Sequence, residues 1–443
     1  MTTPIEIKGY WWLPSSPDDT VAGILTYIPN ESIILELIGQ LKKESSAIEE
    51  FISREDEIVI LGFSSDAKEV SLMNCSPSGG ALNFSCQFPI QRYKCQHLVI
   101  GTHITSLETP LFFKTQIQIP YLSLWATPNS IETSMFFGEK RIEKCCISFN
   151  TGEYHIDTVG FDDYELSIDG VVNYVGEYFE PKIKQRTLVS LTNKSDYSLK
   201  DAIRKIFLFE QFLSFATLAP LESSEIVLYE KSKFQQLDNG EKHFFPIQYI
   251  RVYHGKETHN EQIIAERSSF LFTYETIKAE FQSILKKWFL EPADIAPIRY
   301  HLIECVRQKG FFSSVDFLIV IQAIEGFWWR FRDDDYRRSK HQKNSKNQTP
   351  LKTILESLIN EFKEIEQLNL NEINVSEIVD SRHYFSHFMP KEKKPNAKDG
   401  LELYCLTNKI RKLLICCLLN FVGFTNSQIS KIIQNSNSGY LHD

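Results

Sequence analysis

The chain has 443 residues, 42% of them apolar and 24% charged, and its formal net charge is −9 at neutral pH. These values are those of an ordinary globular protein, long enough for two or three domains. The acidic excess lies in residues 1–260, which argues against a nucleic-acid surface there. Residues 261–443 have a slight basic excess and are the better candidate for one.

The first 195 or so residues contain short segments rich in β-branched and aromatic residues, separated by clusters of turn-forming residues. The expected strands are Ile5–Trp12, Val21–Tyr27, Ser32–Gly39, Glu57–Phe63, His97–Thr102, Thr115–Ile119, Arg141–Phe149 and Tyr164–Val172. Strands this short and this numerous predict a β-sandwich or a barrel-like domain. A helix at Ser198–Ala216 and two further strands, Glu225–Tyr229 and Phe244–His254, are assigned to the same domain.

From about residue 260 the apolar residues recur with the period of a helix. The expected helices are 261–290, 295–308, 312–332, 350–368, 374–388, 401–420 and 427–435. We therefore predict an α+β protein. A β-rich, sandwich-like N-terminal domain with one inserted helix covers residues 1–258, and an all-α helical bundle covers residues 259–443.

The cysteine pattern and the lack of a secretory or membrane-spanning segment indicate the cellular compartment. The chain has nine cysteines, an odd number, without a CxxC motif, and the adjacent pairs Cys145–Cys146 and Cys416–Cys417 do not suit ordinary disulfide geometry. The N-terminus does not have the pattern of a secretory signal, and the longest apolar run, Leu413–Phe424, is too short to span a bilayer. We expect a soluble, cytoplasmic protein without membrane contact.

Four residues in the N-terminal part have the chemistry of zinc ligands: Cys75, Cys86, Cys95 and His97. Their separations match no common zinc motif, so buried or free thiols are the favoured interpretation. No metal and no cofactor is therefore assigned, and a zinc site at these residues stays open.

An arginine and a histidine with four residues between them, Arg382 and His387, stand near the end of the expected helix 374–388, in the sequence DSRHYFSH. RNA carries its own nucleophile, the ribose 2′-OH. Its cleavage therefore needs a base, an acid and positive charge against the phosphate. Histidine suits the first two tasks and arginine the third. Arg92 and His97 have the same spacing, but that region is predicted to form strands and loops.

This stretch resembles the motif of HEPN ribonucleases, in the version carried by ApeA-like anti-phage proteins, which reads Asp-[Ser/Thr]-Arg-Asn followed by three residues and His. Asp380, Ser381, Arg382 and His387 match this motif, and His383 stands where the family has asparagine. Near the start of the chain, GYWWLP at residues 9–14 resembles the opening of the ApeA-type N-terminal domain.

The resemblance implies an enzyme that cleaves RNA without a metal, in a composite cleft built from paired Arg and His residues. It also implies a homodimer or a higher homo-oligomer formed through the HEPN domain. RNA would be the substrate, with tRNA as one candidate. Cleavage would stop phage replication by abortive infection, and the N-terminal domain would sense a phage-derived protein as the trigger.

Helix geometry places a condition on such a site. Positions five apart differ by about 140° around a regular helix, so Arg382 and His387 do not share a face, whereas His383 and His387 do. The arginine must reach around the helix, or the helix must be distorted, or a partner subunit must contribute to the site. Glu325, an acid inside an apolar helical stretch, is a candidate for orienting Arg382; a surface position on an amphipathic helix is an equal alternative.

Two basic runs are candidates for contact with an RNA backbone. One contains Lys391, Lys393, Lys394 and Lys398, directly after the motif, and the other spans residues 337–346. Charge runs in loops are more often simply solvated.

Other functions stay open at this point. His387 could serve only to interact with the helix C-terminus. The C-terminal domain could be a HEPN scaffold that binds RNA or a nucleotide without turnover. The chain could also be a sugar-binding or protein-binding β-domain with a helical dimerisation tail. Loss of RNA cleavage on substitution of His387 would distinguish the enzyme from both.

Overall fold

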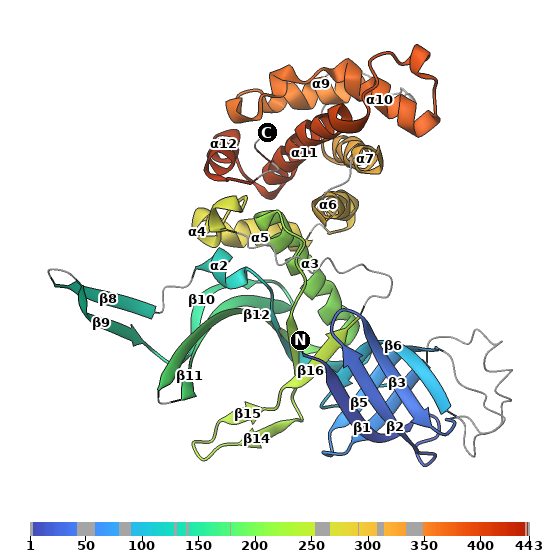
Figure 1. The fold of residues 1–443 in the computed structure, drawn as a ribbon, viewed down its shortest axis with the longest axis vertical. Coiled ribbons are helices and arrows are strands. Elements are labelled where there is room, and N and C mark those ends of the chain that lie inside the picture. The colour runs from blue at the N-terminus through green and yellow to red at the C-terminus, as the bar shows by residue number, and fades with distance from the viewer. Residues whose placement is uncertain are drawn as a thin grey trace. The chain divides into compact units, whose positions relative to one another are not determined.

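A computed structural model describes residues 3–41, 58–78, 90–127, 131–138, 141–177, 179–252, 266–290, 292–307, 314–333, 349–438 and 441. The chain divides into two compact units (Figure 1). The first contains residues 1–120, 128–207 and 222–263, and the second contains residues 121–127, 208–221 and 264–443. The predicted domain boundary at residues 258 and 259 stays a prediction.

The strands at the start of the chain close into a six-stranded barrel. They are β1 (Ile5–Trp12), β2 (Val21–Ile28), β3 (Ser32–Ile38), β4 (Ile58–Ser64), β5 (Glu69–Pro77) and β6 (Ile90–Ile100). Their order is β1-β2-β3-β6-β5-β4, and β4 pairs back with β1. Trp11 is fully buried in the barrel core, and a Cβ at Gly62 would lie 2.4 Å from its ring. Glycine at position 62 therefore lets β4 approach the indole.

The barrel continues into an open, curved sheet through the pairing of β6 with β16 (Figure 1). The further strands, in sheet order, are β16 (Ile247–Arg251), β13 (Glu225–Glu230), β7 (Pro110–Gln118), β12 (Glu180–Ser198), β11 (Tyr164–Glu177) and β10 (Gly152–Gly160). Two hairpins form separate two-stranded sheets: β8 (Ile131–Phe137) with β9 (Ile142–Phe149), and β14 (Phe234–Gln236) with β15 (Lys242–Phe244).

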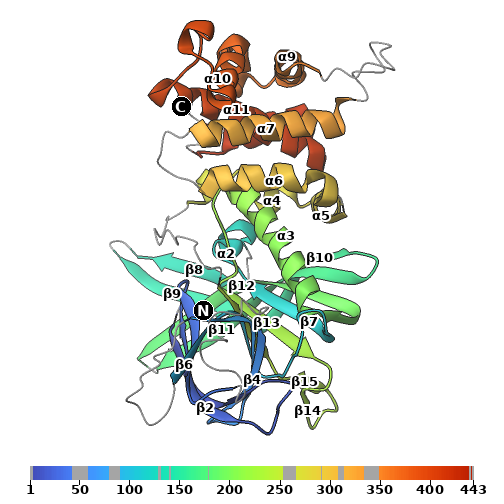
Figure 2. The same ribbon diagram turned by 90° about the vertical axis from the view of Figure 1, so that its right-hand side faces the viewer.

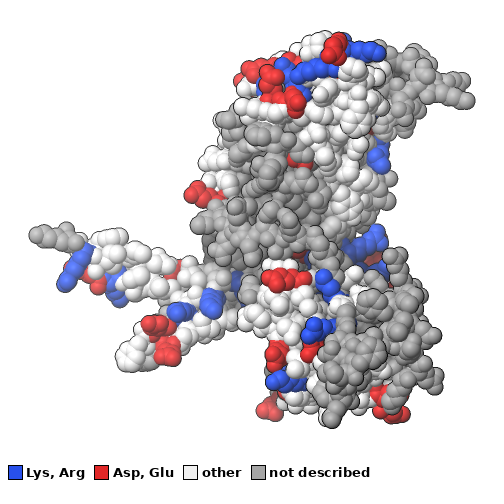
Figure 3. Space-filling model, turned by 45° about the vertical axis from the view of Figure 1, so that its right-hand side comes forward, with Lys and Arg blue, Asp and Glu red and all other residues white. Residues whose placement is uncertain are grey.

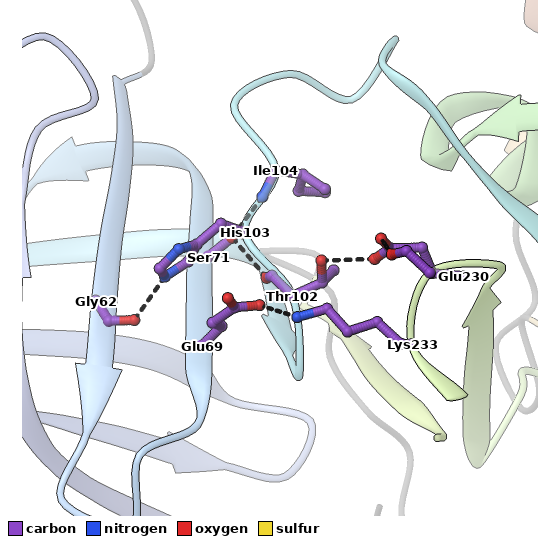
Figure 4. Close-up of polar contacts among 9 residues, drawn as sticks. Gly62, Glu69, Ser71, Thr102, His103, Ile104, Glu230 and Lys233 are labelled. Atoms are coloured by element: carbon purple, nitrogen blue, oxygen red, sulfur yellow. Dashed lines mark hydrogen bonds and ion pairs between the residues drawn. The ribbon is translucent and has the colours of Figure 1, made fainter. Parts of the chain in front are cut away.

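Polar contacts fasten the barrel to the open sheet (Figure 4). The Ser71 hydroxyl on β5 donates to the carbonyl oxygen of Thr102 at 3.0 Å. The Thr102 hydroxyl in turn donates to the Glu230 carboxylate at the end of β13, at 2.9 Å. Glu69 forms an ion pair with Lys233. These contacts join residues of the barrel, or directly after it, to Glu230 and Lys233 at the end of β13, so they hold the barrel and the open sheet together as one unit.

The second unit is helical. Its helices are α2 (Leu122–Ala126), the end of α3 (Leu199–Thr217), α4 (Tyr274–Ile277), α5 (Phe281–Leu290), α6 (Pro292–Arg307), α7 (Ser314–Phe331), α9 (Leu351–Phe362), α10 (Val375–His387), α11 (Gly400–Val422) and α12 (Asn426–Asn435). Short 3₁₀ turns occur at Arg267–Ser269, Glu366–Leu368, Leu370–Glu372 and Lys391–Lys393. Helix α7 lies between α6 and α11 (Figure 2). The centre of α11 is fully buried, as its apolar sequence predicts.

The predicted fold class is confirmed: a β-rich N-terminal region with a barrel precedes a helical C-terminal region. The expectation of one helix over 261–290 is wrong for its described part. Thr273 is extended and its side chain caps a new helix, so that residues 266–290 form a 3₁₀ turn, α4 and α5. Among the described helices, none has the length and apolarity needed to cross a membrane.

Candidate active site

Helix α10 carries the Arg-His motif in its last turns. The helix begins after Asn374, whose side-chain oxygen accepts a hydrogen bond from the backbone N–H of Ser376 at 3.1 Å. It ends at Phe388, which adopts a left-handed conformation with φ of 50° and is followed closely by Pro390. The motif therefore stands where helix and loop meet, with the His387 side chain exposed.

Arg382 and His387 are in direct contact. The Nη1 atom of Arg382 lies 3.1 Å from Nε2 of His387. A guanidinium group can only donate, so Nε2 of the imidazole accepts, and a neutral ring then carries its proton on Nδ1. The helix is regular up to His387. The length of the arginine side chain, rather than a distortion, therefore bridges the angle between the two positions.

Glu325 on α7 contacts the same arginine from the other side. Its Oε2 atom lies 3.7 Å from Nη2 of Arg382, and both side chains are about three-quarters buried. Burial raises the pKa of Glu325, and the positive charge of Arg382 acts in the opposite direction. Arg382 is thus held between a carboxylate and an imidazole, which fixes the direction of its guanidinium group.

His383 lies one helical turn from His387. The two ring centroids are 5.9 Å apart. Burial, followed by the charges of Lys394 and Arg382, lowers the pKa of His383. Its Nδ1 atom is buried and has no hydrogen-bond partner within the described part of the chain. The environment therefore favours a neutral ring with one nitrogen unused.

Asp380 and Ser381 anchor the loop that follows α10. The Asp380 carboxylate accepts hydrogen bonds from Lys394 Nζ at 3.3 Å and from Asn396 Nδ2 at 3.0 Å. The fully buried Ser381 hydroxyl oxygen accepts from the backbone N–H of Lys398 at 2.9 Å. The first two residues of the motif therefore position the loop.

Asn396 is not among the sequence candidates, and Lys398 is one only for its charge, as part of the basic run after the motif, whereas its backbone N–H is what contacts Ser381. Their contacts with α10 span 16 and 17 positions, and no local spacing marks them.

The lysines expected to bind an RNA backbone differ in their surroundings. Lys391 and Lys393 are exposed, whereas Lys394 is largely buried and paired with Asp380. On the face drawn in Figure 3, basic and acidic side chains lie side by side at the end of the helical unit where α9 and α10 are found. The basic run at 337–346 lies outside the described residues.

The second Arg-His spacing forms no site. Arg92 on β6 pairs with Glu36 at 2.6 Å, and His97 is buried with its Nδ1 atom 2.8 Å from the Tyr249 hydroxyl. An odd separation places the two residues on opposite faces of a strand.

The possible zinc ligands can be placed only in part. Cys75 and Cys95 are buried register partners in the barrel core, and Cys86 lies outside the described residues. Among the residues with described positions, no group of three or more His, Cys, Asp or Glu side chains is arranged to hold a metal ion.

Two family models match the chain. The model described as ApeA N-terminal domain 1 matches residues 6–288, and the model described as Apea-like HEPN matches residues 318–428. The second match includes Glu325 and the whole of the motif at 380–387. No curated protein and no solved structure gave a significant match to the chain.

Proposed function

Because the chain belongs to the ApeA N-terminal domain 1 family and carries an Apea-like HEPN domain, we propose that it is a metal-independent endoribonuclease of anti-phage defence. The observation that carries the proposal is the contact of 3.1 Å between Arg382 and His387 at the exposed end of α10. It joins a permanent cation to a proton acceptor within reach of solvent.

Each side chain has a distinct role in the proposed reaction. An RNA phosphate displaces the imidazole from Arg382, and the guanidinium binds two of its oxygens. His387 then takes the proton of the ribose 2′-OH, which attacks phosphorus as the bond to the 5′-oxygen breaks. The products are a 2′,3′-cyclic phosphate and a 5′-hydroxyl. Glu325 holds the arginine, and Lys391 and Lys393 lie where they can attract the RNA backbone.

A second copy of the chain would complete the site. The departing 5′-oxygen needs a proton donor, and one neutral His387 cannot be base and acid at once. Two HEPN domains related by a two-fold axis would bring two Arg382–His387 pairs to one cleft, so that one histidine accepts a proton while the other donates. We therefore propose a homodimer, or a higher oligomer, formed through the HEPN domain.

In this proposal, activity is restrained until infection. The N-terminal part would sense a phage-derived protein, and the cleavage of cellular RNA, with tRNA as one candidate, would then halt phage replication at the expense of the host.

The test uses purified full-length protein, total cellular RNA and excess EDTA. The variants are His387→Ala, Arg382→Ala and, as a matched control on the barrel, Arg92→Ala. We expect cleavage by the wild type and Arg92→Ala, with 2′,3′-cyclic phosphate ends. His387→Ala should lower the rate by roughly 10²–10⁴-fold, the range for loss of a general acid or base.

Equal cleavage by all four proteins would overturn the assignment of the site. If the wild type is inactive alone and in lysate from phage-infected cells, yet binds RNA or nucleotide, the domain is a non-catalytic scaffold and the proposal fails.

A further inference from the structure

The β8–β9 hairpin has one face on which every register-paired side chain is uncharged; the register shift between Phe136 and Phe137 leaves Glu143 without a register partner, with its side chain beside Gly138. Register pairs place the following side chains on this face: Ile131, Thr133, Met135, Phe137, Ile142, Cys145, Ile147 and Phe149. We call it the hairpin face. The opposite face carries Glu132, Ser134, Phe136, Lys144, Cys146 and Ser148. A contact of 5.7 Å between Lys144 Nζ and the Phe136 ring centroid agrees with this division.

The hairpin face is open to solvent. Phe137 is 74% exposed, and Met135, Ile147 and Ile142 are 50–51% exposed. The hairpin forms its own two-stranded sheet, an arm of the first unit in Figure 1. At its base Phe149 stacks on Tyr174 of β11, with centroids 6.4 Å apart. An isolated two-stranded sheet is marginally stable in water, and an exposed apolar patch of this kind marks an interaction surface.

From these observations we infer that the hairpin face packs against the hairpin face of a second copy, about a two-fold axis. Each apolar face becomes the second layer that the other lacks, as in a β-sandwich. The occupant follows from chemistry and area. The register-paired side chains of this face are uncharged, so an apolar surface suits it as a partner. A two-fold axis brings the same apolar face of the second copy against it.

The area is sufficient for a specific contact. With about 200 Å² for each large apolar side chain, the hairpin face exposes roughly 500–600 Å² per copy. Two such faces would remove roughly 1,100 Å² from water, just above the area of about 1,000 Å² that a specific interface needs. This contact does not depend on RNA cleavage, and it uses residues outside the HEPN domain.

Two adjacent exposed cysteines provide the test. Cys145 lies near the middle of the hairpin face and Cys146 on the opposite face. In a face-to-face dimer the two Cys145 thiols come close together, whereas the Cys146 thiols are separated by both sheets. Full-length protein lacking the exposed Cys405 (Cys405→Ser) is treated with a short bismaleimide, and the cross-linked peptides are mapped.

We expect a dimer cross-linked through Cys145, retained in Cys146→Ser and lost in Cys145→Ser. Phe137→Asp should lower its yield at least tenfold. Phe136→Asp, the same change one residue away on the opposite face, should leave it unchanged. A cross-link that needs Cys146, or one that Phe137→Asp leaves intact, would overturn the inference. A result with no cross-linked dimer would also overturn it, and would leave the face to a different partner. None of these outcomes bears on the RNA cleavage assay.

Discussion

Arg382 and His387 lie five positions apart on α10, yet Nη1 of the arginine is 3.1 Å from Nε2 of the histidine. The two positions differ by about 140° around the helix, so only a long, extended side chain can join them. The guanidinium also has a second terminal nitrogen, which faces Glu325. One arginine thus meets an acid and an imidazole with separate donors.

Replacement of Arg382 by lysine should therefore fail although the charge is kept. A single ammonium group cannot contact Glu325 and His387 together or bind two phosphate oxygens. If the proposed function holds, we expect Arg382→Lys to lower kcat/KM by roughly 10–100-fold. Arg92→Lys, at an exposed barrel position, is the control and should change nothing. Full activity of Arg382→Lys would contradict a forked contact with phosphate.

Glu325 should act on the rate through the direction of Arg382. In Glu325→Gln the side chain keeps its size, but the carboxylate that faces the guanidinium is lost. We expect kcat to fall by roughly tenfold, with KM and the melting temperature little changed. Glu356→Gln on α9, where the acid pairs with Lys352 in solvent, is the control. A large drop in melting temperature with unchanged kcat would instead identify Glu325 as structural.

The loop after α10 should loosen when its anchors are removed. Ser381→Ala leaves the backbone N–H of Lys398 without its acceptor at a buried position, which costs about 1–3 kcal/mol of unfolding free energy. Asp380→Ala removes the acceptor for Lys394 and Asn396, with a comparable cost. Ser386→Ala on the same helix is the control. Urea unfolding measures the difference, and equal midpoints for Ser381→Ala and Ser386→Ala would refute the anchoring role.

The sequence predicts elements better than it predicts contacts. The bounds of β1 and, within one residue, those of α10 follow from alternation, from the apolar period and from Pro390. Strand β12 is missed because its first seven residues, EPKIKQR, are polar and read as a loop, although they pair with β11 in a strand of 19 residues. Local propensity gives way there to the tertiary pairing.

The sequence identifies the residues of the site but not how their side chains contact one another. The motif indicates Arg382 and His387, but their contact depends on the rotamer of the Arg382 side chain, which helix periodicity does not predict. The partner of Asp380 is Lys394 rather than the neighbouring Arg382, because the loop folds back over the helix. Closure of the barrel by β1 and β4 likewise joins residues about 50 positions apart, such as Trp11 and Gly62, beyond the reach of any local pattern.

Buried His97 should make the stability of the N-terminal unit dependent on pH. Burial, followed by the charge of Arg251, lowers the pKa of His97 from 6.5 to about 4. Between pH 6.5 and about pH 4 the His97 imidazole is therefore mostly protonated in the unfolded chain and mostly neutral in the folded chain. The contribution of His97 to the free energy of unfolding is fully present above pH 6.5 and is lost as the pH drops toward 4. The loss should reach about 2 kcal/mol near pH 5.

His97→Gln removes the titrating ring and retains a polar group that can reach the Tyr249 hydroxyl. Urea unfolding of the wild type and of this variant at about pH 7.5 and about pH 5 isolates the contribution of one histidine, because every other titrating group is common to both proteins. The variant should lose less stability between the two pH values than the wild type, by the same amount of about 2 kcal/mol. Identical losses would mean that His97 takes up its proton equally in the folded and unfolded chains, and that the barrel does not exclude it from water.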